Sequence, residues 1–337
     1  MKKKPTITAA IVMIVVALAC ACAFTACGKT QESPAAEELS YWMKTIRDDT
    51  PITQMVIPGS HDSGTVGMVS VCETQNKDFA AQLAVGTRYF DVRPRLKGNG
   101  EIVFYHMFSS DNRYEDFLAD VEEFLSANPS EFLILDHQHC DPAEESFYNI
   151  IFGMLEEKLG AERILCAPAG VSNADYINSL TLGDVRGKVL VTLGTEDLPE
   201  QYPFVMTRDA DAQVREGSVL HSPYIGKYNK SGSEEYVSEY LQEYIDMYAQ
   251  LGGICILQGQ LTGGILEDKE AKHDPNMSAW IRALKDDEET LAHINVIMRD
   301  YVTGKKCADI IELNKYKGFV KDECVKEFDA LVAKFAE

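Results

Sequence analysis

Short apolar runs alternate with longer amphipathic segments through most of this chain. The runs are three to six residues long and rich in valine, isoleucine, leucine and aromatic residues. Runs of this kind are typical of strands that are buried on both faces. They predict strands at residues 55–57, 87–92, 102–105, 132–135, 188–193, 254–257 and 296–298.

The intervening segments have the spacing of helices. Residues 114–127 repeat apolar side chains at helical intervals, and the pattern stops at Asn128, before Pro129. Residues 144–159 and 233–251 predict further helices. Buried strands separated by helices favour a mostly parallel α/β sheet. Seven or eight strands in about 300 residues fit a single (β/α)8 TIM-type barrel better than a small doubly wound sheet.

The N-terminal residues predict export. A basic start, Met1 to Lys4, precedes an uncharged apolar run at 7–24, as in a secretory signal. The sequence Phe24-Thr25-Ala26-Cys27-Gly28 resembles the lipobox of bacterial lipoproteins, although leucine is usual where Phe24 stands. That resemblance implies a signal peptide at 1–27 and a lipid on Cys27. An ordinary cleaved signal is the alternative.

The domain organisation follows from this N-terminus. Residues 28–37 are polar and poor in large apolar residues, which indicates a flexible tether. Residues 38–337 are then one catalytic barrel. We expect an extracytoplasmic protein, lipid-anchored at a bacterial cell surface or, alternatively, secreted, and we expect a monomer.

The charge balance excludes several classes of partner. The chain carries a formal net charge of −21, and loss of Lys2, Lys3 and Lys4 with the signal takes it near −24. Nucleic-acid binding needs Lys and Arg for phosphate contacts, so we expect none. A basic patch for anionic lipid is equally disfavoured. Contact with a membrane must therefore come from the lipid anchor or from local apolar residues.

The cysteines predict neither a metal site nor a cofactor. Those that would remain after residue 27 are scattered, without a Cys-x-x-Cys pair or zinc-like spacing. Cys255, within an apolar run, is best explained as a buried free thiol. Pairing among the others is open. They are Cys72, Cys140, Cys166, Cys307 and Cys324.

Polar residues recur where the predicted strands end. In (β/α) barrels the C-terminal ends of the strands meet at one face and carry the chemistry. We therefore expect these side chains to share one pocket. They are His61 and Asp62 after the first strand, Arg93 after the second, His106 at the end of the third, Asp136, His137 and His139 after the fourth, and Asp300 after the last.

Two histidines and an arginine suit acid–base cleavage of a phosphodiester. One imidazole takes a proton from the attacking oxygen while the other gives a proton to the leaving oxygen. Arg93 can bind a phosphoryl group with two donors. Asp62 and Asp300 are available to orient the histidines, and no metal is needed. Taken singly, a histidine capping a strand or an arginine in a buried ion pair is an ordinary structural feature.

Six ordered motifs make the hypothesis specific. They begin with Ile57-Pro58-Gly59-Ser60-His61-Asp62-Ser63-Gly64-Thr65, Gly86-Thr87-Arg88-Tyr89-Phe90-Asp91-Val92-Arg93 and His106. They continue with Asn128-Pro129-Ser130-Glu131, Leu182-Gly183-Asp184-Val185-Arg186-Gly187-Lys188 and Arg299-Asp300-Tyr301. Together they resemble bacterial phosphatidylinositol-specific phospholipase C, over nearly all of the chain after residue 52.

The resemblance implies a distorted barrel and metal-independent cleavage. By it, His61 is the general base for the inositol 2-hydroxyl and Asp300 orients it. Arg93 stabilises the phosphoryl charge, and His106, supported by Asp62, is the general acid that protonates the diacylglycerol oxygen. The first product is a cyclic phosphate. Calcium-using relatives have acidic ligands where Arg93 stands.

The headgroup pocket departs from the family. A ring-binding lysine is matched by Gln138, with His139 beside it, and an arginine closing a later strand is matched by Gly194. An aspartate is matched by Gly226, while the ring-stacking tyrosine is retained as Tyr228. Three expected inositol contacts are thus replaced, which leaves the headgroup open.

Two other functions compete with this one. A metal-dependent glycerophosphodiesterase-like barrel would need a carboxylate cluster, and its Glu-x-Asp motif is missing after the second strand. His137 and His139 could also be metal ligands. We favour the alternative that their side chains form part of a polar pocket wall. The other alternative is a non-catalytic surface binding protein on the same barrel.

Overall fold

The computed structural model describes residues 34–195, 198–209, 213–222, 234–248, 251–261 and 266–335. The predicted signal peptide, Cys27, residues 28–33 of the predicted tether, and Tyr228 lie outside these residues. The first described element is the 3-10 segment η1 (Pro34–Thr45). Among the described helices, none has the length and apolar character that crossing a membrane would need.

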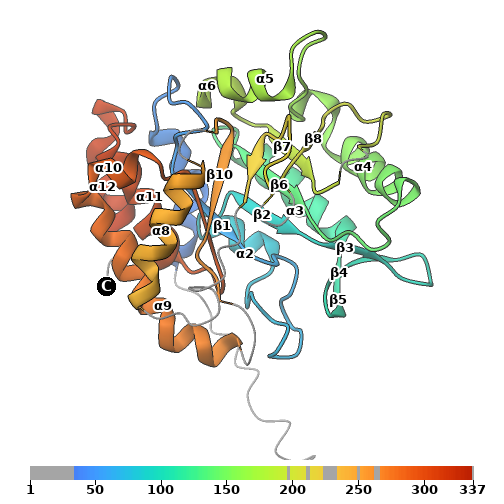
Figure 1. The fold of residues 1–337 in the computed structure, drawn as a ribbon, viewed down its shortest axis with the longest axis horizontal. Coiled ribbons are helices and arrows are strands. Elements are labelled where there is room, and N and C mark those ends of the chain that lie inside the picture. The colour runs from blue at the N-terminus through green and yellow to red at the C-terminus, as the bar shows by residue number, and fades with distance from the viewer. Residues whose placement is uncertain are drawn as a thin grey trace, which may run out of the picture. The chain divides into compact units, whose positions relative to one another are not determined.

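Eight parallel strands form the centre of the fold, as the (β/α)8 prediction required (Figure 1). Except at β8 and β9, which end the sheet, each strand pairs with the next barrel strand in the order of the chain, and β1 pairs with β11. The seam between β8 and β9 is narrow: Val219 N donates to Thr207 O at 2.9 Å, and Asp209 N donates to Leu220 O at 3.0 Å. The strands are β1 (Ile57–Ser60), β2 (Tyr89–Val92), β6 (Leu133–His137), β7 (Val189–Leu193), β8 (Val205–Thr207), β9 (Leu220–His221), β10 (Ile254–Gln258) and β11 (Val296–Arg299).

Helices surround this barrel (Figure 1). The predicted helices at 114–127, 144–159 and 233–251 are α3 (Tyr114–Ala127), α4 (Glu145–Leu159) and α8 (Glu234–Tyr248). The others are α2 (Phe79–Ala84), α5 (Asn173–Ser179), α6 (Leu182–Val185), α9 (Leu266–Ala283), α10 (Glu288–Ala292), α11 (Gly304–Tyr316) and α12 (Val325–Ala333), with short 3-10 turns η2 (Ala161–Arg163), η3 (Leu284–Asp286) and η4 (Asp322–Cys324).

The third predicted strand was wrongly placed in the barrel. Residues 102–105 belong to β4 (Ile102–His106), which lies between β3 (Pro94–Leu96) and β5 (Phe108–Arg113) in a separate antiparallel sheet. The segment that joins β3 to β4 is a tight turn, closed by Lys97 N donating to Glu101 O at 2.8 Å. Such a turn can join only antiparallel strands, because a parallel pair needs a longer crossover.

The N-terminal end of the barrel is closed by packing. Trp42 of η1 is fully buried and donates its indole N–H to Gly86 O at 3.1 Å. Arg88, directly before β2, is buried against Glu131 with Nε–Oε2 of 2.9 Å and donates to the carbonyls of Leu39 and Ser40. A buried ion pair is retained only with such satisfied geometry. The open mouth of the barrel therefore lies at the C-terminal ends of the strands.

Candidate active site

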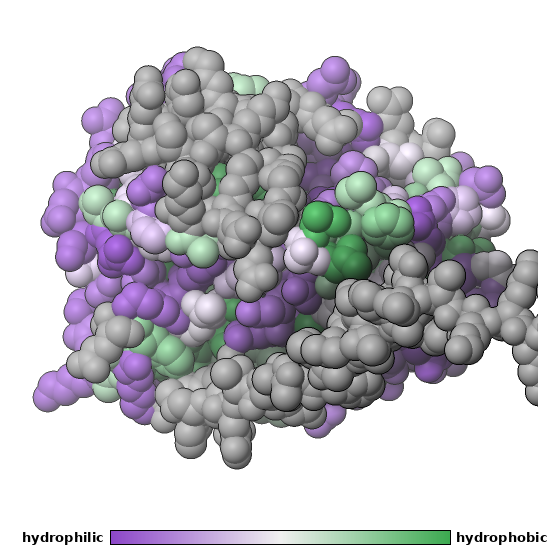
Figure 2. Space-filling view, turned by 90° about the horizontal axis from the view of Figure 1, so that it is seen from below, coloured by the Kyte–Doolittle hydropathy of each residue, from purple (hydrophilic) through white to green (hydrophobic). Residues whose placement is uncertain are grey.

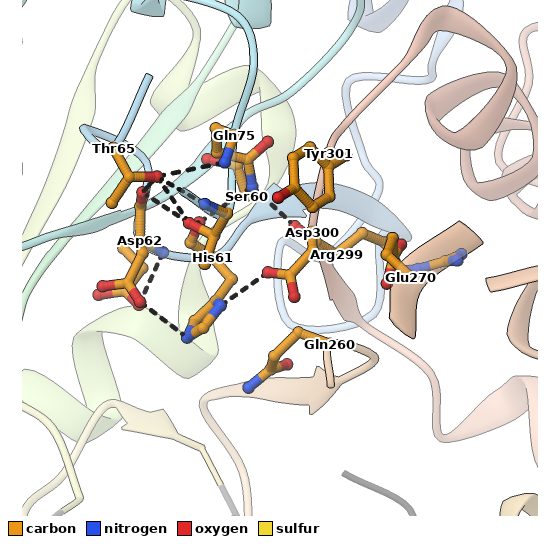
Figure 3. Close-up of polar contacts among 12 residues, drawn as sticks. Ser60, His61, Asp62, Thr65, Gln75, Gln260, Glu270, Arg299, Asp300 and Tyr301 are labelled. Atoms are coloured by element: carbon orange, nitrogen blue, oxygen red, sulfur yellow. Dashed lines mark hydrogen bonds and ion pairs between the residues drawn. The ribbon is translucent and has the colours of Figure 1, made fainter. Parts of the chain in front are cut away.

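His61 and Asp300 are brought together by the pairing of β1 with β11. Ser60 lies opposite Arg299 in that pair, and His61 N donates to Arg299 O at 3.1 Å. The next side chains along the two strands then meet, with His61 Nδ1 2.7 Å from Asp300 Oδ1 (Figure 3). The Asp300 carboxylate accepts the Nδ1 proton, so the atom of His61 that can exchange a proton is Nε2.

Arg93 lies between two buried carboxylates. Its Nε is 2.6 Å from Asp62 Oδ1, and its Nη2 is 2.7 Å from Asp91 Oδ2. The same Nη2 lies 3.3 Å from His61 Nε2. Asp62 is held in place by its own N–H, which donates to Asp91 Oδ2 at 3.1 Å. The guanidinium is therefore fixed beside the proton-exchanging atom of His61.

His106 reaches the same site from the antiparallel sheet. Its Nδ1 lies 2.9 Å from Cys72 O and 3.6 Å from Asp62 Oδ2. The side chain is 25% exposed, against 13% for His61, so solvent and ligands have easier access to it. The Cys72 carbonyl accepts the Nδ1 proton and leaves Nε2 as the exchanging atom.

Five of the eight residues expected to meet at the strand ends thus share one site: His61, Asp62, Arg93, His106 and Asp300. The details differ from the resemblance in one respect. Asp62 was expected to support His106, but it lies closer to Arg93 Nε at 2.6 Å and to His61 Nε2 at 3.3 Å. One carboxylate therefore contacts both imidazoles and the guanidinium.

Neighbouring charges determine the protonation states of His61, Asp91 and Arg93. Burial lowers the pKa of His61, but the charges of Asp62 and Asp300 outweigh it and raise the pKa to about 9. Burial raises the pKa of Asp91, yet Arg93 overcomes this effect and lowers the pKa to about 2. The carboxylates likewise raise the pKa of Arg93 despite its burial. The free site therefore holds a charged imidazole and a charged guanidinium beside the ionised carboxylate of Asp91.

Gln75 holds the backbone at both strand ends, and no local sequence pattern indicated this. Its side-chain amide donates to His61 O at 2.9 Å and to Arg299 O at 3.0 Å, and its Oε1 accepts from Val302 N at 3.0 Å. Gln75 is fully buried on a loop between β1 and α2. It therefore fixes the spacing of His61 from Asp300.

The predicted headgroup residues lie on the β6 side of the mouth. Gln138 is 8% exposed and donates to Asp136 Oδ2 at 3.0 Å. His139 is exposed, and its carbonyl accepts a hydrogen bond from the Tyr105 hydroxyl. His137 points away from this wall into an aromatic cluster, 2.9 Å from the Tyr114 hydroxyl, and burial lowers its pKa to about 4. His137 is therefore neither a pocket residue nor a metal ligand with His139.

Arg208 was not anticipated from the sequence. It follows β8, its side chain is 6% exposed, and its Nε is 3.1 Å from Asp136 Oδ1. It also lies over Gly194, where a Cβ would be 3.6 Å from its Nη1. Gly194 is where the family resemblance placed an arginine. The guanidinium of Arg208, which follows the neighbouring strand, therefore lies beside Gly194, the position where the family has an arginine.

One group of described residues could hold a metal. Donor atoms of His61, Asp62 and Asp91 lie within 4.8 Å of one another. Arg93 contacts all three, so its positive charge already sits among these donors. A cation bound at this point would have to displace the guanidinium.

Comparisons with known proteins agree with the fold. Residues 49–152 match the family model PI-PLC X, a stretch that contains His61, Arg93 and His106. The chain is 34% identical over 100 residues to 1-phosphatidylinositol phosphodiesterase of Staphylococcus aureus, covering 28% of this chain and 32% of the relative. That match therefore spans about a third of the relative's length.

Longer matches are weaker in identity. Human PI-PLC X domain-containing protein 3 is 26% identical over 326 residues, which cover 82% of this chain and 94% of the relative. The solved structure of phosphatidylinositol-specific phospholipase C from Listeria monocytogenes has a TM-score of 0.62 at 18% identity, over 82% of this chain and 98% of that one. At that identity the likeness concerns the fold alone.

Proposed function

We propose, from the PI-PLC-like X region and barrel that this chain carries, that it cleaves phosphatidylinositol or a related inositol phosphodiester, a glycosyl-phosphatidylinositol anchor included. The observation that supports this most directly is the placement of Arg93 beside His61 Nε2, with His106 across Asp62. A base (His61), an acid (His106) and a phosphate-binding cation (Arg93) then lie around the place where the phosphodiester would bind.

The first bond change uses His61. Its Nε2 takes the proton from the headgroup hydroxyl next to the phosphate, and that oxygen attacks phosphorus. Asp300 stabilises the resulting imidazolium at 2.7 Å. Arg93 donates to the phosphoryl oxygens as their charge grows. Because the nucleophile belongs to the substrate, the product is a cyclic phosphate and no water is consumed.

The second bond change uses His106. The bond from phosphorus to the diacylglycerol oxygen breaks, and His106 Nε2 gives that oxygen a proton. The Nδ1 contact with Cys72 O keeps the ring oriented for this transfer. The proton taken by His61 and the one given by His106 balance over the reaction.

Arg93 supports a mechanism without a divalent ion. Its charge is placed between Asp62 and Asp91, where a metal-dependent diesterase would need its ion. Headgroup contacts come from the β6–β8 side, where Gln138 and Arg208 replace two of the expected family contacts. The identity of the headgroup depends on that wall and on Tyr228.

Attachment to a bacterial surface through Cys27 is a separate part of the proposal. It rests on the lipobox-like sequence around Cys27. Metabolic labelling with a fatty acid, lost on Cys27→Ser, supports it. Unlabelled protein released from cells identifies the secreted alternative.

The test of the function is a lipid panel. The full-length protein is offered phosphatidylinositol and, separately, choline and ethanolamine phospholipids, with chelator present, and phosphorus products are identified. Cyclic inositol phosphate from the first lipid alone supports the proposal. Cleavage of the choline lipid contradicts the cyclising mechanism, because that headgroup has no neighbouring hydroxyl. Activity that needs added calcium or magnesium identifies the metal-dependent class, and headgroup binding without turnover identifies a binding protein.

A further inference from the structure

Charged side chains gather behind the strand that carries Asp300. Glu270 and Asp274 come from α9, Lys306 from α11 and Arg299 from β11, and they are here called the α9–α11 charge cluster. The four side chains are 8%, 19%, 12% and 1% exposed, in that order. Figure 2 views the molecule from the side to which α9 extends in Figure 1, and hydrophilic side chains cover much of its coloured surface. Charges on that surface are hydrated, whereas those of the cluster are largely removed from water.

Opposite charges in the cluster are paired. Lys306 Nζ lies 2.6 Å from Glu270 Oε1 and 3.1 Å from Asp274 Oδ1, and Arg299 Nη2 also contacts the Asp274 carboxylate. Buried ion pairs lose through desolvation most of what their attraction gains, and apolar side chains of similar size often stabilise a fold equally well. Packing α9 against α11 therefore does not by itself explain why charges are kept here.

A third contact of Lys306 gives a reason, because it reaches the backbone of the active site. Its Nζ donates to Asp300 O at 2.8 Å. The same peptide unit is held on its other side, where Tyr301 N donates to Thr74 O at 2.7 Å. The Thr74 hydroxyl donates in turn to His61 O at 3.1 Å. The peptide between Asp300 and Tyr301 is therefore fixed at both its oxygen and its nitrogen.

This peptide depends on such support because Tyr301 has a strained backbone. Its φ is +45°, in the left-handed region that is unfavourable for a residue with a large side chain. Strained backbone persists where the surrounding contacts fix it, and it is concentrated at functional sites. A rotation of the peptide that relieved the strain would turn Asp300 O away from Lys306. It would also change the backbone from which the Asp300 carboxylate reaches His61 Nδ1 at 2.7 Å.

We infer that Lys306 is a positioning residue for Asp300: its hydrogen bond to Asp300 O, directed by the ion pair with Glu270, fixes the carboxylate that orients His61. In Figure 3 His61 and Glu270 lie on opposite sides of Asp300, so this support comes from behind the carboxylate. Lys306 acts through Asp300 and not on the substrate. The inference rests on the proposed function only in the use of His61 as the base.

The contact between His61 and Asp300 is measured without turnover. Nuclear magnetic resonance of full-length protein with isotopically labelled histidine rings reports on His61 Nδ1, whose signal is identified by its loss in His61→Gln. The double variant Lys306→Met, Glu270→Gln removes the donor to Asp300 O without leaving the Glu270 carboxylate unpaired, and it should shift the His61 Nδ1 signal. Glu270→Gln alone keeps the donor and should shift the signal much less.

A matched control comes from the same helix. Lys315, near the end of α11, forms an exposed ion pair with Asp329, and Lys315→Met should leave the His61 signal and turnover unchanged. If the double variant does not fold, Lys306→Gln with Glu270→Gln takes its place. Its two amides can bond to each other, while the side chain at 306 is one bond too short to keep the native contact.

Turnover of phosphatidylinositol measures the consequence for catalysis. In the double variant kcat should fall at least about tenfold while KM changes less than about threefold, because a small misplacement of a catalytic group lowers the rate more than it weakens binding. Glu270→Gln should lose clearly less. Equal losses of kcat in the single and double variants would overturn the inference, because the donor to Asp300 O would then have no effect of its own.

The two measurements separate this inference from the proposed function. An unmoved His61 signal in the double variant overturns the role of Lys306, whatever happens to kcat. A shifted signal, in a protein whose native form turns over no lipid, retains Lys306 as a positioning residue and rejects the proposed function. Turnover by the native protein together with an unmoved signal does the reverse.

Discussion

The carboxylate of Asp300 lies 2.7 Å from Nδ1 of His61, although the two residues are 239 positions apart in the chain. Their meeting depends on the closure of the barrel, which pairs β11 with β1. Asp62 and Asp300 together raise the pKa of His61 to about 9. His61, the proposed general base, is therefore protonated in the free protein at neutral pH. The enzymatic activity should rise with pH, because His61 must lose this proton before it can act as a base.

Replacing Asp300 tests this relationship. In Asp300→Asn one of the two charges that raise the pKa of His61 is gone, so the acid limb of kcat/KM should move to lower pH. The value of kcat should fall by about 10²-fold or more, because the imidazolium loses its partner. Full pH profiles of both proteins give the measurement. An unmoved acid limb would show that His61 is not the group that must lose a proton.

Replacing His106 tests the assignment of acid and base. His106→Ala should lower turnover of phosphatidylinositol by about 10² to 10⁴-fold. An inositol phosphodiester with an aryl leaving group, which departs without a proton, should lose far less. His61→Ala should lose activity on both substrates. The same loss on both substrates in the His106 variant would contradict its role as the acid.

Arg93→Ala should leave two buried carboxylates without their cation. Breaking such a pair costs roughly 3–5 kcal/mol of folding free energy, and loss of the phosphate donor lowers kcat by about 10²-fold or more. Because His61, Asp62 and Asp91 remain close, manganese or calcium should raise the melting temperature of the variant but not of the native protein. Arg93→Lys, which keeps the charge, serves as control. Equal stabilisation of all three proteins would reject this account.

Arg208→Gln tests the replaced headgroup wall. Arg208 sits over Gly194 with its Nε on Asp136, so its loss should raise KM for phosphatidylinositol by roughly 10-fold and change kcat less. The single variant leaves the buried Asp136 charge without its cation and should lose stability. The double variant Asp136→Asn, Arg208→Gln removes that charge and should recover stability but not KM. A fall in kcat alone, with KM unchanged, would place Arg208 outside the headgroup site.

The His61 pKa also predicts a pH dependence of folding. The pKa rises from 6.5 to about 9 on folding, so the stabilisation is complete below pH 6.5 and disappears as the pH rises through about 9. The total is roughly 3 kcal/mol, from 1.36 kcal/mol for each pKa unit. Urea unfolding at pH 6, 7.5 and 9 should show this loss in the native protein. His61→Gln should lack it, and a parallel decline in both would assign the slope to other groups.

Local pattern was enough to predict most of the barrel. Strands such as 132–135 and 254–257 are buried on both faces, and that burial appears directly as a run of apolar residues. Two barrel strands, Val205–Thr207 and Leu220–His221, were missed because three and two residues are too few to form a pattern. Residues 102–105 had the pattern of a buried strand, but pattern does not say which sheet a strand joins.

Four of the five residues proposed for catalysis, all except His106, follow barrel strands and could be grouped from the sequence because barrel topology brings strand ends to one face. The side chains and backbone groups that these residues contact could not be predicted from the sequence. The sharing of Asp62 by Arg93 and both histidines, the Gln75 contacts to two strand ends, and the position of Arg208 over Gly194 depend on the strand register and the course of loops. The periodicity of burial is a local property, because it depends on the order of apolar and polar residues within one segment. Contacts between side chains far apart in the chain exist only once the barrel has closed.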